Sequence, residues 1–123
     1  MFLFHFQNSI NLTKEKLINF LIELKLKNKK VIAYGAPAKG NTFLNFCLID
    51  KNLIEFTVDR AKTKIGKFLP GSGIPIYDIK KIKSYNPDYI IILPWNLENE
   101  IKTQIKKLKL KSKFITCIPK LKI

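Results

Sequence analysis

The sequence predicts an α/β fold with an open parallel sheet, and two observations carry this prediction. Short apolar runs alternate with longer segments in which apolar residues recur at helical spacing. The run 88–95, "DYIIILPW", is apolar almost throughout, as expected of a central strand that is buried on both faces. Alternating strands and helices form a parallel sheet with right-handed crossovers. We therefore expect a single Rossmann-like domain over residues 1–123, with about five strands in the order 3-2-1-4-5 and flanking helices.

An extra helix is predicted before the first strand. Thr13 can cap it, because a threonine oxygen accepts a hydrogen bond from the first free N–H groups of a helix. The helix would cover 14–30, with Leu17, Leu21 and Leu24 as its buried stripe.

The remaining elements follow from turn residues between apolar runs. Pro37 suits the first turn of a helix, and Asp78 can cap another helix that stops before Asn86 and Pro87. One side of the helix after Pro37 would carry four apolar residues: Phe43, Leu44, Cys47 and Leu48. One face of the last helix would carry four more: Leu97, Ile101, Ile105 and Leu108. The predicted strands cover 31–34, 54–60, 74–77, 88–95 and 113–119, and the other predicted helices cover 38–50, 79–85 and 96–110.

The segment "GAPAKGNT" after the first strand is like two known phosphate-binding loops and departs from both. Gly35, Gly40 and Thr42 keep the spacing of G-x-x-x-x-G-K-[ST], but Asn41 stands in place of the lysine. The two glycines also fit the outer positions of G-x-G-x-x-G, where Pro37 replaces the middle glycine and removes an N–H donor. The pattern therefore argues against both a nucleoside triphosphate and a dinucleotide at this loop.

Lys39 is the most informative residue of this segment. A lysine in the first turn of a helix opposes the helix dipole, and it is explained if an anion binds beside it. The alternative is that Lys39 is one more surface lysine. Asp59 ends the second strand about 20 residues after the glycines, where a dinucleotide-binding protein would hold a ribose. It could equally pair with Arg60 or cap a turn.

Ligands of such sheets bind beyond the carboxyl ends of the strands, near the point where the strand order reverses. Three stretches converge there: the glycine-containing loop, the pair Asp59–Arg60 and the pair Trp95–Asn96. Trp95 could stack on a base or sugar ring, or it could close the top of the core.

Composition narrows the class of protein. The net charge of +14 raises the prior for phosphate-bearing partners. Every basic residue except Arg60 is a lysine, however, which disfavours a nucleic-acid reader and favours the interpretation that these are solvated surface lysines. Cys47 and Cys117 lie far apart and are expected to be buried free thiols. With one histidine, no zinc site can be assembled from soft ligands.

Neither a membrane helix nor a signal peptide is visible, so we expect a cytoplasmic protein with no membrane partner.

Four segments in register carry a family resemblance: "YGAPAKGNTFLN", "FTVDR", "KIGKFLPGSGIPIY" and "DYIIILPWNLENEI". From about Val31 to the end of the sequence, the chain resembles the C-terminal domain of sugar C-methyltransferases, which modify nucleotide-linked deoxysugars. In the intact family, a zinc-binding segment and an S-adenosylmethionine-binding domain precede this domain. The sugar nucleotide lies between the middle and C-terminal domains, and the general base belongs to the middle one.

The resemblance implies that this domain binds a nucleotide-diphospho-sugar and is catalytically incomplete by itself. It implies no catalytic residue, bound cofactor or metal here, S-adenosylmethionine being bound elsewhere in the intact family, and a separate methyltransferase-domain chain as a potential partner. A non-catalytic nucleotide-binding or scaffold module is the alternative, and a basic nucleic-acid-binding domain is a weaker one. The substrate-binding residues that we expect are Lys39, Gly40, Asn41, Thr42, Asp59, Arg60, Trp95 and Asn96.

Overall fold

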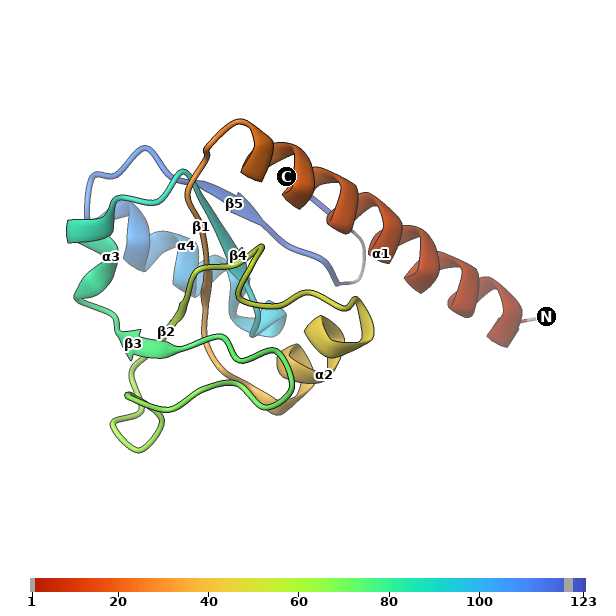
Figure 1. Cartoon of the computed structure of the whole chain (residues 1–123), viewed down its shortest axis with the longest axis horizontal. Helices are drawn as coiled ribbons and strands as arrows, with labels where there is room; N and C mark the ends of the chain where they lie inside the picture. Colours follow the sequence, from red (N-terminus) through yellow and green to blue (C-terminus); the bar gives the residue numbers. More distant parts are fainter. Residues whose placement is uncertain (1, 119–120) are drawn as a thin grey trace.

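The computed structural model describes residues 2–118 and 121–123, and for residues 2–9 it describes the backbone alone. Five strands form one sheet in the order β3-β2-β1-β4-β5, with every neighbouring pair parallel, as the sequence predicts (Figure 1). The strands are β1 (Val31–Tyr34), β2 (Thr57–Asp59), β3 (Ile76–Asp78), β4 (Tyr89–Ile92) and β5 (Lys113–Ile115). The helices are α1 (Phe2–Leu26), α2 (Ala38–Phe46), α3 (Lys81–Tyr85) and α4 (Glu98–Lys106), with a short 3-10 helix η1 (Trp95–Leu97) before α4.

The sheet separates two apolar cores because successive side chains of a strand point to opposite faces. In β1, Val31 and Ala33 face the core under α1 and α2, whereas Ile32 and Tyr34 face the core under α3 and α4. Full burial of each Leu or Ile side chain contributes roughly 1.5–3 kcal/mol, so these two cores hold the helices on the sheet. The predicted stripe of α1 is buried in the first core, which confirms it: Leu17, Leu21 and Leu24.

The ends of α1 differ from the prediction. Thr13 is buried inside the helix, so its predicted role as a cap is wrong. No Gly or Pro precedes it that would interrupt the helix. At the other end, Asn28 adopts a left-handed conformation (φ 59°), and the N–H of Lys29 donates to the carbonyl of Leu24 at 2.9 Å. Asparagine tolerates this conformation better than most residues, which is why the helix stops before the lysine pair. The N-terminal end of α1 extends past the sheet (Figure 1).

Helix α2 is shorter than predicted. Pro37 occupies its N-cap position and Cys47 its C-cap position. Phe43, Leu44 and Cys47 are buried as predicted, but Leu48 is 79% exposed, so its predicted place on the buried side is wrong. Leu48 has a φ of 58°, which turns the chain away from the helix and its side chain into solvent.

The Asp78 cap is also wrong in its position. Asp78 is the last residue of β3, and its Oδ1 accepts the N–H of Lys80 at 2.9 Å, while Lys80 itself stands at the N-cap of α3. The helix ends at Asn86, which is left-handed, so the predicted stop before Pro87 is confirmed.

The other segment boundaries shift by a few residues. Strands β2, β4 and β5 are shorter than the predicted ranges, and Pro119, at the end of the predicted range 113–119, lies outside the described residues. Ile101 and Ile105 are buried on α4, whereas Leu97 lies in η1 and Leu108 beyond the end of α4.

Helix α2 approaches the end of β4 closely at Gly40. A β-carbon at Gly40 would lie 2.9 Å from Cβ of Leu93 and 3.2 Å from Cγ of Pro37. Cβ of Leu93 is fixed by its own backbone and cannot move aside cheaply, so the packing of α2 on the sheet requires glycine here.

We predict that Gly40→Ala lowers the free energy of unfolding by about 1–3 kcal/mol, as overpacking does in other cores. Thr42→Ala, an exposed change in the same helix, is the control and is expected to stay within about 0.5 kcal/mol. Urea denaturation followed by circular dichroism measures both. A Gly40→Ala variant that is as stable as the wild type would show that helix propensity, about 1 kcal/mol in favour of alanine, outweighs the contact.

Both cysteines are free thiols inside the core under α1 and α2, as expected from the sequence. Burial raises the pKa of Cys47 to about 11 and that of Cys117 to about 12. The thiolate is the reactive form of cysteine. These thiols are therefore expected to react slowly with alkylating reagents, because they are inaccessible to solvent and because they stay protonated.

We predict that iodoacetamide at pH 9 leaves the native protein unmodified and alkylates both cysteines in guanidinium chloride, as mass spectrometry would show. Because folding raises these pKa values, the folded state retains protons that the unfolded state loses, and the free energy of unfolding falls as the pH rises from about 9 to about 12. The slope should be smaller in the variant Cys47→Ala/Cys117→Ala. Rapid alkylation of the native protein would contradict the burial of these thiols.

Candidate functional site

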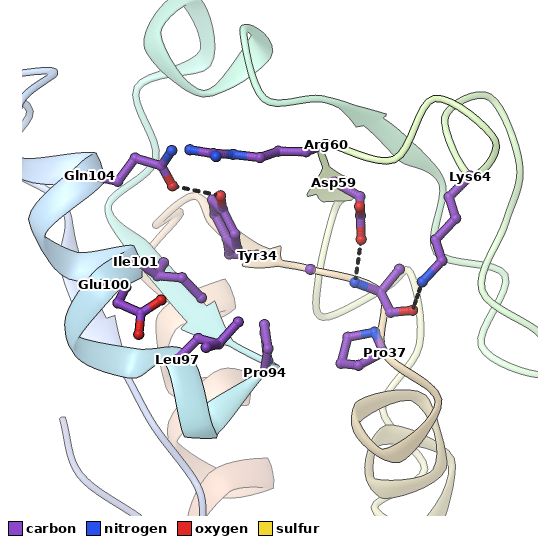
Figure 2. A pocket seen from close by; sticks show the side chains of 12 residues that line it. Tyr34, Pro37, Asp59, Arg60, Lys64, Pro94, Leu97, Glu100, Ile101 and Gln104 are labelled. Carbon is purple, nitrogen blue, oxygen red and sulfur yellow. Dashed lines mark hydrogen bonds between the residues drawn. The ribbon is translucent and has the colours of Figure 1, made fainter.

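A cavity of about 400 Å³ opens at the carboxyl ends of β1 and β2, beside the start of α4 (Figure 2). This is the edge where ligands of open parallel sheets bind, next to the reversal of strand order between β1 and β4. The lining combines cations, carboxylates, amide and phenol groups with apolar surface: Tyr34, Gly35, Ala36, Pro37, Asp59, Arg60, Lys64, Pro94, Leu97, Glu100, Ile101 and Gln104.

The floor of the cavity is a sharp turn that follows β1. Gly35 has a φ of 93°, and a β-carbon there would lie 2.7 Å from Cδ of Pro94, so no other residue fits without displacing the chain after β4. Its N–H donates to the carbonyl of Val58 at 2.7 Å, and its carbonyl accepts the hydroxyl of Thr57 at 2.6 Å. The turn is therefore fixed to β2 on one side and packed on the end of β4 on the other.

Asp59 completes the attachment of this turn. One carboxylate oxygen accepts the N–H of Ala36 at 2.9 Å, and the other accepts the N–H of Ala61 at 2.8 Å. A dinucleotide-binding protein would direct this carboxylate to a ribose, whereas here both oxygens hold the protein backbone. Asp59 lines the cavity, and its carboxylate joins the turn after β1 to the loop after β2.

Two cations lie on the β2 side of the cavity. Lys64 donates from Nζ to the carbonyl of Ala36 at 3.0 Å, which places its charge at the floor of the cavity. The guanidinium of Arg60 extends across the top of the cavity, above the Tyr34 ring and toward α4 (Figure 2). The β2 side of the cavity therefore carries two cationic groups beside the carboxylate of Asp59.

Helix α4 supplies the opposite wall. Tyr34, 7% exposed, donates its hydroxyl hydrogen bond to Oε1 of Gln104 at 2.8 Å. Burial raises the pKa of the Tyr34 phenol above its ordinary value, and the charge of Arg60 partly opposes this rise, so the phenol stays protonated at neutral pH. Glu100 lies one helical turn before Gln104 on the same wall.

Sequence reasoning missed four polar residues of this cavity: Tyr34, Lys64, Glu100 and Gln104. One signal was available for α4, because Glu100 and Gln104 flank the buried pair Ile101 and Ile105 and so must lie at the edge of the face that packs on the sheet. No comparable signal distinguishes Lys64 from the other lysines of the long loop before β3.

A second, apolar groove of about 480 Å³ lies on the other side of the chain segments after β1 and β4. Three of the predicted site residues, Lys39, Thr42 and Trp95, line this groove and not the cavity. The Trp95 ring packs edge-on against Phe43, with centroids 6.5 Å apart and planes at 76°. The other residues that line the groove are Ile10, Ala38, Phe43 and Phe46.

The eight predicted site residues are thus not brought together: two line the cavity, three line the groove and three line neither. Asp59 and Arg60 meet in the cavity. Gly40 is buried against Leu93, and Asn96 is exposed in η1 and lines neither the cavity nor the groove. Asn41 is half-buried, and its buried Oδ1 has no hydrogen-bond partner within the described part of the chain. Ligand contact by each of the eight predicted residues stays a prediction.

None of the described helices is both long and apolar enough to cross a membrane. Among the side chains that the structure describes, in residues 10–118 and 121–123, the Cys, Asp and Glu groups form no cluster of three that could hold a metal ion.

Comparison with known proteins shows the family. Residues 2–119 match the family model described as C-methyltransferase C-terminal domain. Over 92 residues, the sequence is 40% identical to the C-methyltransferase NovU of Streptomyces niveus, a match that covers 74% of this chain and 22% of NovU. The chain thus spans less than a quarter of the length of this relative. By the extent of the family match, the chain belongs to the family of C-methyltransferase C-terminal domains.

Proposed function

We propose that this domain binds a nucleotide-diphospho-sugar in the cavity at the carboxyl ends of β1 and β2, as one wall of the substrate site of a C-methyltransferase. The observation that carries the proposal is the cavity itself: about 400 Å³, at the strand-order reversal, with Arg60 and Lys64 on one side. Its volume lies within the range of small-molecule sites.

The chemistry of the lining supports this class of ligand. The guanidinium and ammonium groups of Arg60 and Lys64 would compensate the charge of a diphosphate. The carboxylate of Glu100 can accept hydrogen bonds from sugar hydroxyl groups. Pro94 and Leu97 offer apolar surface against which a sugar or base ring would pack.

In this proposal, the domain holds and orients the substrate, and the methyl transfer is carried out elsewhere. S-adenosylmethionine would supply the methyl group from a methyltransferase domain, either on another chain or in another part of the same protein. Asp59 would act indirectly, by holding the loop that forms the cavity floor. The family of this chain supports the transferase assignment, since its model and its relative are both named for C-methyltransferases.

We predict that thymidine diphosphate and a thymidine-diphospho-sugar bind with micromolar dissociation constants, about −8 kcal/mol, in calorimetric titrations. Arg60→Gln should weaken binding by about tenfold or more, because one charge-assisted hydrogen bond contributes roughly 1.5–3 kcal/mol. The matched control is Lys62→Gln, which removes the same charge from an exposed residue of the same loop outside the cavity lining. Equal affinities of Arg60→Gln and the wild type would contradict the proposal.

Lys39→Gln tests the loop predicted from sequence. Lys39 lines the apolar groove, so we expect this change to alter the affinity less than twofold. A large loss would instead place the phosphates near the start of α2.

We also predict that the protein alone, given S-adenosylmethionine and a keto-sugar nucleotide, forms no methylated sugar above background in an assay by mass spectrometry. The reason lies in the proposed division of roles, in which this domain holds the substrate and a methyltransferase domain elsewhere binds S-adenosylmethionine. Methylated product from this chain alone would refute catalytic incompleteness without affecting the binding proposal.

A further inference from the structure

We infer that Arg60 and Gln104 form an anion-binding pair in the cavity, suited to a diphosphate group, and that Tyr34 is the positioning residue that holds Gln104 in the required orientation. The inference deepens the proposed function and rests on it for the identity of the complete ligand. The part of the inference that concerns the anion rests on the geometry of the Arg60, Gln104 and Tyr34 side chains.

The first step is the hydrogen bond between Tyr34 and Gln104. Tyr34 is 7% exposed, and a buried phenol hydroxyl needs a hydrogen-bond partner. It donates to Oε1 of Gln104 at 2.8 Å, across the gap between β1 and α4. With Oε1 on the Tyr34 hydroxyl, the NH₂ group of the same amide points away from Tyr34.

The NH₂ group of the Gln104 amide faces Arg60 (Figure 2). Figure 2 shows the amide nitrogen of Gln104 directed at the guanidinium of Arg60, above the Tyr34 ring. Both groups can only donate hydrogen bonds, so neither satisfies the other. Two donors from opposite walls, one of them charged, are complementary to an acceptor between them, and an oxyanion is the acceptor that a guanidinium binds best.

The third step concerns the carboxylates that could neutralise Arg60 instead. Asp59, its neighbour in sequence, already accepts two backbone N–H groups through its two oxygens. Glu100 lies on the same wall as Gln104 but lower, beside Leu97 and Ile101, away from the guanidinium (Figure 2). Neither carboxylate therefore neutralises Arg60, whose guanidinium lies close enough to the Tyr34 hydroxyl to act on its pKa. Lys64, at the cavity floor, is placed to meet the far side of an extended anion such as a diphosphate.

Inorganic pyrophosphate tests the pair without the nucleoside or the sugar. Gln104→Glu places a carboxylate beside Arg60, so an internal ion pair replaces the anion, and the affinity for pyrophosphate should fall at least tenfold. Thr103→Glu is the matched control, since it adds the same charge at an exposed position of α4 outside the cavity lining. It should change the affinity less than threefold. Thermal unfolding of each variant verifies that the fold is intact.

Tyr34→Phe tests the positioning role. The change keeps the ring and removes the hydroxyl group that holds Oε1, so the amide can rotate and turn its oxygen toward Arg60. We expect a loss of pyrophosphate affinity of about threefold to tenfold, with a shallower dependence on salt because Arg60 is then partly satisfied. In the background of Gln104→Glu, Tyr34→Phe should have no further effect, which a merely structural role of Tyr34 would not produce.

The outcomes separate this inference from the proposed function. Equal effects of Gln104→Glu and Thr103→Glu, or no binding of pyrophosphate by the wild type at millimolar concentration, would overturn the anion-binding pair. An unchanged affinity of Tyr34→Phe would overturn the role of Tyr34. Nucleotide-sugar binding that is insensitive to Gln104→Glu would leave the proposed function standing without the pair. Pyrophosphate binding that depends on Gln104, with no added affinity for the nucleotide sugar, would support the pair and count against the proposed ligand.

Discussion

The hydrogen bonds of the Asp59 carboxylate are the interaction on which the geometry of the cavity depends. The carboxylate accepts the N–H of Ala36, in the turn after β1, and the N–H of Ala61, in the loop after β2. Without it, two backbone donors beside the cavity would lose their partners, and each such loss in a buried place costs about 1–3 kcal/mol. The same turn contains Gly35. Its positive φ and the closeness of Pro94 leave no room for a side chain at this position. The path of this turn decides which side chains face the cavity.

The turn also explains why Lys39 lies away from the cavity that Asp59 and Arg60 line. Helical side chains advance by about 100° per residue, so the start of α2 directs Pro37 to the cavity and Lys39 to the apolar groove. The chain after β4 behaves likewise, with Pro94 and Leu97 lining the cavity and Trp95 lining the groove. Lys39 and Trp95 therefore lie at the same edge of the sheet as the cavity, but they line the groove on the other side of the chain segments after β1 and β4.

The parts of the fold that the sequence predicts are those with a repeating physical signal. Apolar runs and helical periodicity predict the strand order and the buried faces, because burial repeats every two or 3.6 residues. Segment ends depend on single residues such as Asn28 and Leu48, and a left-handed leucine has no sequence signal at all. The cavity residues of α4 escape prediction for a related reason. Gln104 is an ordinary polar residue at the edge of a helix, and its role arises only when β1 brings Tyr34 to it.

In the proposed function, side chains of the cavity would bind the anion in place of the backbone of the loop after β1. A glycine-rich loop binds phosphate with backbone N–H groups that cost little entropy to order. Here Pro37 has no N–H, and the N–H of Ala36 donates to Asp59. Two backbone N–H groups that such a loop would offer to a phosphate are therefore not available. Side-chain donors can replace them only if their rotamers are fixed, since ordering a long side chain costs up to about 2 kcal/mol. The buried Tyr34 supplies that restraint for Gln104, and the cavity wall thereby gains a positioned donor that faces Arg60.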